Sequence, residues 1–229
     1  MRVIFSLARI GAAVFGLTAA SCKEVKSPGS TMSPPSLDAN TAPRPPGISI
    51  RQAFAEEAHP LLTNMINGAF QHYHARCAKD LETAERVTSD GKQVASMMET
   101  PCNAFLVAEE VKDDASKSVV GCVHVCWSGE THSKDEDVDA QFGMLSVLKE
   151  CSGRGIGKLL VSAAEERCRK ELGRENIVVE ISVVSFFPEL FGWYEAQGYR
   201  KKRTVPFPMP ELIRDDCDFE LQLMTKTIP

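Results

Sequence analysis

The body of the sequence lacks the excess of positive charge that binding to a nucleic-acid backbone requires. Lys and Arg number 26 against 31 Asp and Glu, and the first 46 residues hold five of the cations but only two of the anions. The rest of the chain therefore carries 21 cations against 29 anions, a net charge of −8. An acidic body of this kind excludes nucleic acid as an expected partner and favours a cationic substrate or partner.

The eight cysteines lack any Cys-x-x-Cys pair. They are scattered through 229 residues, a chain long enough to bury a core without disulfide staples, so we expect free, buried thiols. Cys122, His124 and Cys126 alternate along one expected strand and would share a face. This spacing offers at most three zinc ligands and no fourth is marked, so no metal site is predicted.

Long apolar runs are missing except at residues 1–22, which are mostly apolar or small. One interpretation is a secretory signal with Ala19-Ala20-Ser21 as a cleavage site. Another is an organellar transit peptide, because Arg2 and Arg9 precede the first acid, Glu24. A retained membrane helix is disfavoured, since a central Arg costs roughly 2.5 to 3.5 kcal/mol on insertion scales.

Residues 23–47 are rich in Pro and Ser and contain almost no large apolar side chain. Such a stretch cannot offset the entropy cost of ordering, so we expect a disordered linker. One folded domain is expected at residues 48–229, and no internal repeat is visible.

Hydrophobic periodicity predicts the order strand, helix, helix, three strands, helix, strand, helix and two strands. The apolar run at 177–184 is typical of a strand buried on both faces. The expected strands are 48–51, 104–109, 118–127, 139–147, 177–184, 199–205 and 218–226, and the expected helices begin at Pro60, Gly91, Ile156 and Pro188.

A glycine-rich loop, Ser152 to Lys158, connects an expected strand to an expected helix. Its alternating glycines let the backbone approach a ligand, and the helix N-terminus presents free N–H groups and positive charge to an anion. Arg154 and Lys158 add cationic side chains. The loop is therefore predicted to bind phosphate.

Two common phosphate loops do not fit this run. The dinucleotide fingerprint needs Gly-x-Gly-x-x-Gly in a parallel unit, but here the third glycine comes one residue early and follows a predicted antiparallel meander. A P-loop needs a glycine where Ser152 stands and a Ser or Thr where Leu159 stands.

The loop instead resembles the acetyl-CoA motif of the GCN5-related N-acetyltransferases (GNAT), Gln/Arg-x-x-Gly-x-Gly/Ala after a strand. Gly155 and Gly157 match both glycines, whereas Ser152 replaces the Gln or Arg. A second run resembles the later family segment ending in Tyr-x-x-x-Gly-Phe/Tyr, here Tyr194 to Tyr199 with Pro-Glu-Leu ahead of it. The resemblance covers about residues 48–228.

The resemblance implies the acyl-CoA N-acyltransferase fold. This is an α+β domain with a mixed, mostly antiparallel splayed sheet flanked by about four helices, and acetyl-CoA in the gap between strands 139–147 and 177–184. It implies an N-acetyltransferase that moves an acetyl group directly from acetyl-CoA to a primary amine of a small molecule or protein, with no metal. A non-catalytic acyl-CoA-binding module is the alternative. Use of acyl-CoA would favour a cytoplasmic or organellar location over secretion.

The resemblance also implies roles for individual residues. Tyr194 matches the tyrosine that protonates the departing thiolate, and backbone groups of Leu145 and Val147 would contact the pantetheine arm and thioester. No general base is singled out, and the candidates are Glu180, Ser182, Glu189, Asp139 and Gln141. The cofactor contacts of the loop would come from Ser152, Gly153, Arg154, Gly155, Ile156, Gly157 and Lys158.

Overall fold

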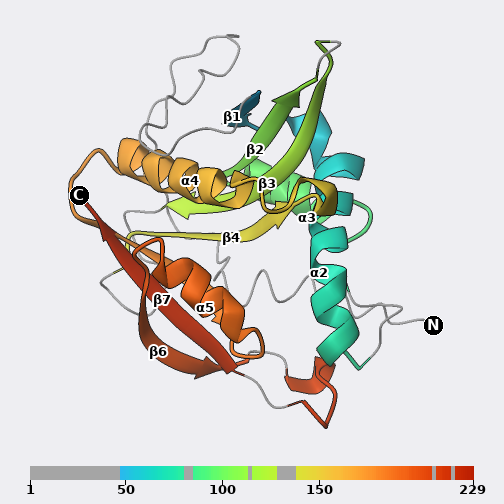
Figure 1. Cartoon of the computed structure of the whole chain (residues 1–229), viewed down its shortest axis with the longest axis vertical. Coiled ribbons are helices and arrows are strands. Elements are labelled where there is room, and N and C mark those ends of the chain that lie inside the picture. The colour runs from blue at the N-terminus through green and yellow to red at the C-terminus, as the bar shows by residue number, and fades with distance from the viewer. Residues whose placement is uncertain (1–46, 80–84, 113–114, 128–137, 208–209, 218–219) are drawn as a thin grey trace.

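The computed structural model describes residues 47–79, 85–112, 115–127, 138–207, 210–217 and 220–229. The expected targeting segment at 1–22 lies outside these residues, as does the expected linker at 23–47 except for Gly47. The described residues form seven strands and four α-helices, with four short helical turns (Figure 1).

The elements follow one another in the predicted order. The strands are β1 Ile48–Gln52, β2 Asn103–Val111, β3 Lys117–Trp127, β4 Ala140–Val147, β5 Ile177–Val184, β6 Arg200–Pro206 and β7 Glu220–Ile228. The α-helices are α2 Thr63–Cys77, α3 Lys92–Glu99, α4 Ile156–Leu172 and α5 Pro188–Glu195. The short turns are η1 Ala55–Glu57, η2 Ala58–Leu62, η3 Lys149–Cys151 and η4 Pro210–Leu212.

Helical backbone begins at Pro60, the predicted start of the first long helix, and continues through η2 into α2. Pro60 lies in η2, and α2 begins at Thr63, whose Oγ1 donates a hydrogen bond to the Ala58 carbonyl at 2.7 Å. The residue before a proline is pushed out of the helical region, and His59 accordingly has extended φ and ψ of −141° and 137°.

The seven strands form one mixed sheet in the order β1-β2-β3-β4-β5-β7-β6. Every neighbouring pair is antiparallel except β4 and β5, which are parallel. Antiparallel neighbours can follow each other through short turns, whereas the parallel pair needs a crossover, which α4 supplies. The predicted α+β class with a mixed, mostly antiparallel sheet flanked by four helices is therefore confirmed.

Helices cover both faces of the β1 to β4 half of the sheet (Figure 1). Alternate residues of β2 point to opposite faces, so Leu106 belongs to the core under α4, while Phe105 and Val107 belong to the core under α2 and α3. The buried stripe of α4 includes Leu160, Ala164 and Cys168. These two cores fix β4, which carries the functional loop at its end.

Gly121 on β3 lets α4 pack closely against the sheet. A Cβ at this position would lie 2.9 Å from the Ser146 carbonyl oxygen and 3.1 Å from Cδ1 of Leu160. We expect Gly121→Val to lower the free energy of unfolding by about 1–3 kcal/mol through overpacking, measured from denaturant midpoints. Gly192→Ala on α5 is the matched control, because its Cβ would meet nothing within 4 Å and should stabilise the helix by about 0.5–1 kcal/mol.

The cysteines of the described residues are all free thiols, and five of the seven are buried. These five agree with the expected buried thiols, Cys102 and Cys217 are only partly buried, and Cys22 lies outside the described residues. None of the helices within the described residues combines the length and the apolar character needed to cross a membrane.

Candidate active site

The sheet opens at the junction between β4 and β5. These parallel strands pair only through Ala140 with Val179 and Gln141 with Glu180, after which β5 continues along β7 alone. The strands therefore diverge toward the C-terminal end of β4. A cavity of about 1270 Å³ occupies this region, bounded by α2, β4, the glycine loop, β5 and α5.

A β-bulge interrupts β4 at the cavity. Cys122 pairs with Ser146 and His124 with Gly143, so β4 has one more residue than β3 between these pairs. Met144 at the bulge has a φ of +52°, a conformation that non-glycine residues seldom adopt. Bulges take backbone groups out of the ladder and are common next to active sites.

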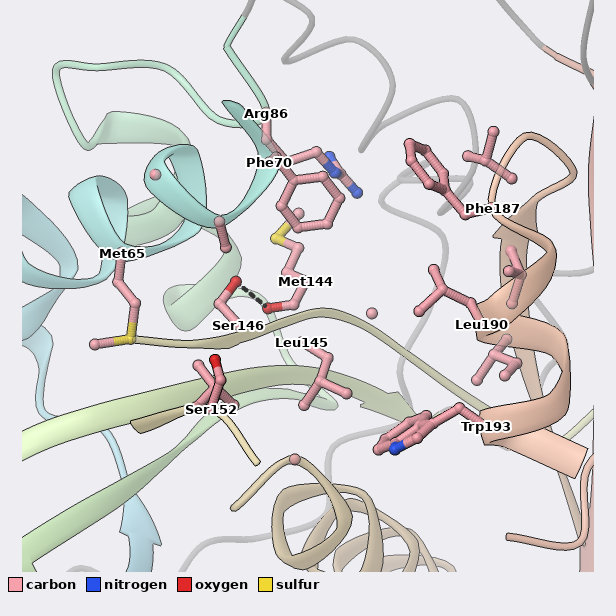
Figure 2. Close-up of a pocket in the computed structure, with 18 of the residues that line it drawn as sticks. Met65, Phe70, Arg86, Met144, Leu145, Ser146, Ser152, Phe187, Leu190 and Trp193 are labelled. Atoms are coloured by element: carbon pink, nitrogen blue, oxygen red, sulfur yellow. Dashed lines mark hydrogen bonds between the residues drawn. The ribbon is translucent and has the colours of Figure 1, made fainter. Parts of the chain in front are cut away.

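The buried side chain of Ser146 forms a hydrogen bond across this bulge. Its side chain is 2% exposed, and its Oγ donates a hydrogen bond to the Met144 carbonyl at 3.1 Å (Figure 2). Leu145 and Val147 follow at alternate positions, are half-buried, and line the cavity. Leu145 and Val147, the two residues predicted to contact the cofactor through their backbone, therefore lie on the cavity wall. They stand on the part of the β4 edge that does not pair with β5.

The glycine loop lies at the cavity edge in a conformation that favours glycine. Gly153 and Gly155 have φ of +77° and +81°, and a Cβ at either position would meet only open space. Gly155 is the N-cap of α4, so the free N–H groups of that helix face the cavity. Of the seven predicted loop residues, all except Arg154 line the cavity.

The two cations of the loop point in different directions. The Arg154 guanidinium pairs with the Glu110 carboxylate of β2 and donates from Nη1 to the Cys151 sulfur at 3.6 Å. This pairing lowers the pKa of Glu110. Lys158 is exposed and lies on the cavity wall. Lys158 is therefore the loop cation that the structure brings to the cavity.

Tyr194 lies on α5 and borders the cavity opposite the loop. It is half-buried, and its ring centroid is 4.8 Å from that of Trp193 and 6.4 Å from that of Phe142. Trp193 approaches the loop, because a Cβ on Gly157 would lie 3.4 Å from its indole ring. The α5 aromatic side chains and the glycine loop thus form two facing walls.

The acids considered as candidate bases lie away from the cavity. Glu180 is buried and accepts a hydrogen bond from Nε2 of Gln141 at 3.0 Å. Glu189 opens α5, where a negative charge is favoured by the helix dipole, and does not line the cavity. Ser182 does line it, and Glu150 is the only carboxylate among the described residues that do.

A second region of the cavity faces α2 and was not found by sequence reasoning. Figure 2 shows Phe70, Arg86 and Phe187 on the side of Met144 that lies away from Trp193. Arg86 is 7% exposed, and its guanidinium carbon lies 5.5 Å from the centroid of the Phe70 ring. Burial lowers the pKa of Arg86 to about 10, so it stays charged at neutral pH.

The candidate zinc residues on β3 are buried in the protein core. Burial raises the pKa of the Cys122 thiol to about 12, while burial and then the charge of Arg86 lower the pKa of His124 to about 3. His124 Nε2 lies 2.9 Å from the Asn103 amide oxygen. In the described part of the chain, no group of three or more His, Cys, Asp or Glu side chains is placed to hold a metal ion.

Comparison with known protein families identifies residues 101–201. This segment matches the family model described as the acetyltransferase (GNAT) domain. The matched segment contains β2 to β5, α4, α5 and the glycine loop, and so covers most of the cavity wall. No curated protein is similar enough in sequence to be counted as a relative.

Solved structures share the fold. The protein yncA from Salmonella typhimurium, solved with acetyl-CoA, has a TM-score of 0.57 at 18% identity over 80% of this chain and 95% of its own. A variant of spermidine N-acetyltransferase SpeG from Vibrio cholerae has a TM-score of 0.55 at 13% identity over 79% and 94%. A GNAT-family acetyltransferase from Staphylococcus aureus has a TM-score of 0.53 at 13% identity over 80% and 99%.

Proposed function

We propose that this chain, whose residues 101–201 match the acetyltransferase (GNAT) domain model, transfers an acetyl group from acetyl-CoA directly to a primary amine. The observation that carries the proposal is the single cavity that joins the glycine loop at the start of α4 to Tyr194 on α5. A donor held at the loop and an amine entering from the α2 side would meet beside the β4 bulge.

The loop residues fit the pyrophosphate of acetyl-CoA. Gly153 and Gly155 leave open space where side chains would otherwise stand, and the free N–H groups of α4 begin directly after them. Ile156 contributes through its backbone only, because its side chain is 1% exposed and packs in the core. Ser152 replaces the longer Gln or Arg of the family motif, so its side chain offers a shorter reach to the phosphates.

The β4 edge fits the pantetheine arm and the reacting thioester. Beyond Gln141, β4 has no β5 partner, so backbone groups of Leu145 and Val147 on that edge are placed to bond to an extended ligand. An N–H group aimed at the thioester carbonyl stabilises the negative charge that develops on its oxygen during attack. The Ser146 hydroxyl holds the bulge carbonyl and so fixes this edge.

The reaction forms a C–N bond and breaks the thioester C–S bond. One proton must leave the amine and one must reach the departing thiolate. Tyr194, on the opposite wall, is the proposed proton donor to sulfur. Because the carboxylates considered as bases lie elsewhere, we propose that ordered water carries the amine proton to solvent.

The test is a panel of primary amines with acetyl-CoA, scored by release of free thiol. The panel should include small-molecule amines and peptides with lysine side chains. Thiol release that depends on one class of amine, with the acetylated product seen by mass spectrometry, supports the proposal. A thermal shift with acetyl-CoA but no release with any amine would favour the non-catalytic acyl-CoA-binding module instead.

The two loop cations should differ in their effect on acetyl-CoA affinity. We expect Lys158→Met to raise the Kd for acetyl-CoA about tenfold, because it removes a charge from the cavity wall. Arg154→Met should raise it less than about threefold, since that guanidinium pairs with Glu110 and an exposed pair contributes little. Isothermal calorimetry on both variants measures the difference, and a larger effect at Arg154 would contradict the geometry described above.

A further inference from the structure

Arg86 places a buried positive charge in the half of the cavity that faces α2. The side chain lines the cavity and is 7% exposed, and its Nη1 atom is fully buried without a hydrogen-bond partner. The guanidinium lies beside the Phe70 ring, pointing from the segment before α3 toward the space between α2 and α5 (Figure 2). A buried charge that has no anionic partner among the described residues is costly, and such a group in a cavity is a candidate for binding a ligand of opposite charge.

The backbone that carries Arg86 is held in place by Asn67 of α2. The Asn67 amide oxygen accepts hydrogen bonds from the N–H groups of Arg86 and Val87 at 2.9 and 3.0 Å, and its Nδ2 donates to the Val87 carbonyl at 2.9 Å. The Val87 side chain is fully buried. Three hydrogen bonds and a packed neighbour therefore preorganise the position from which Arg86 reaches into the cavity.

No negative charge within the described residues balances Arg86. None of their carboxylates forms an ion pair with it. His124 lies close enough to sense the charge but stays neutral, because its pKa is far below neutrality. The body of the chain as a whole is acidic and favours a cationic ligand, whereas this part of the cavity carries the positive charge of Arg86.

We infer that the acceptor amine belongs to a molecule that also carries a carboxylate, and that Arg86 binds this carboxylate. The guanidinium presents donors in a planar fork that matches the two oxygens of a carboxylate. The Phe70 ring lies beside the guanidinium, so an apolar side chain on the same molecule also fits (Figure 2). The inferred substrate class is free amino acids with apolar side chains, and it rests on the proposed acetyl transfer.

The same geometry disfavours polycationic acceptors. A polyamine or a basic peptide would bring ammonium groups next to the Arg86 guanidinium in a low-dielectric space, where like charges repel strongly. Arg86 also opposes protonation of a nearby amine, and the neutral amine is the nucleophile. The site therefore selects for one anion and one neutral amine on the same molecule.

The experiment compares acceptors that differ only in the carboxylate. Phenylalanine and methionine are assayed with acetyl-CoA beside phenylalaninamide and methioninamide, with spermidine and a lysine peptide as cationic acceptors. We expect kcat/KM for the free acids to exceed that for the amides by about 10- to 100-fold, because hydrogen bonds to a charged group are lost in the amides. Arg86→Met should abolish this preference while changing KM for acetyl-CoA by less than about threefold.

Arg86→Lys and thermal stability separate binding from a structural role. Arg86→Lys keeps the charge without the planar fork, so it should retain part of the preference for free acids. Arg86→Met should melt at the same or a higher temperature than the wild type, because a buried unpaired charge is replaced by an apolar side chain of similar length. A lowered melting temperature with equal losses for acids and amides would mean that Arg86 only supports the fold, and the inference would be wrong.

The outcomes also distinguish this inference from the proposed function. Thiol release with amides or spermidine at rates equal to those with free acids would overturn the inference and leave acetyl transfer to amines intact. If Arg86→Met weakens acetyl-CoA instead of the acceptor, Arg86 belongs to the donor site and the inference is again overturned. No thiol release with any acceptor would overturn the proposed function, and the inference with it.

Discussion

Replacing Tyr194 with Phe should lower kcat about 100-fold while changing the Kd for acetyl-CoA less than about threefold. The hydroxyl is the only group removed, and general acid catalysis typically contributes about 100- to 10,000-fold. The ring stays, so its contacts with Trp193 and Phe142 are kept. Steady-state kinetics with the best amine of the panel and calorimetry with acetyl-CoA measure the two quantities separately.

Tyr199→Phe is the matched control for this variant. Tyr199 is five residues further along, is fully buried, and donates its hydroxyl hydrogen bond to Glu165 at 2.9 Å. Glu165 also accepts from Lys226 of β7 at 2.8 and 2.9 Å, so it keeps an ionic partner when the hydroxyl is lost. Tyr199→Phe should therefore lower the free energy of unfolding by about 1–3 kcal/mol and leave kcat within about threefold.

Comparing Tyr194→Phe with Tyr199→Phe shows whether the Tyr194 hydroxyl is catalytic or structural. A catalytic Tyr194 predicts a large loss in kcat with little loss of stability, whereas Tyr199 predicts the opposite pattern. If Tyr194→Phe weakens acetyl-CoA binding as much as it lowers kcat, its hydroxyl serves the packing of α5 and the proton reaches the thiolate by another route. The proton donor would then have to be sought among water and Ser182 on the cavity wall.

The fold was largely predictable because it depends on local patterns. Residues of β2 to β5 are rich in β-branched and aromatic side chains, and α4 repeats apolar residues at helical spacing between a glycine loop and Gly173. The glycine loop was predictable for the same reason, since its conformation depends on residues adjacent in sequence. Backbone φ above zero at Gly153 and Gly155 is what such spacing indicates.

The acceptor half of the cavity could not be predicted in this way. Arg86 stands in a short segment without periodicity, and its role depends on Asn67, nineteen residues away, and on Phe70 of the same helix. The bulge at Met144 was equally hidden, because a positive φ at a methionine contradicts its local preference. Such a conformation is imposed by the strands on either side and by the Ser146 hydrogen bond.

Gly155→Glu should raise the Kd for acetyl-CoA by at least about 100-fold. Gly155 is the N-cap of α4, and a Glu there would place a carboxylate against the N–H groups that a phosphate needs. The carboxylate is favoured at this end of a helix, so it competes with the ligand while stabilising the free protein. The φ of +81° costs a side-chain residue about 1–2 kcal/mol, and the surrounding space is open. We expect a folded protein that has lost its donor site.

Gly173→Glu is the control, because Gly173 caps the other end of the same helix. Its φ is +60° and a Cβ there also meets nothing within 4 Å, so the backbone strain is comparable. An acid at the C-terminus of a helix is unfavourable, and Gly173→Glu should therefore be the less stable of the two variants. It should nevertheless bind acetyl-CoA with nearly wild-type affinity by calorimetry. If the wild type and Gly155→Glu bind acetyl-CoA with equal affinity, the phosphates of acetyl-CoA do not bind at this loop. The donor site would then have to lie elsewhere.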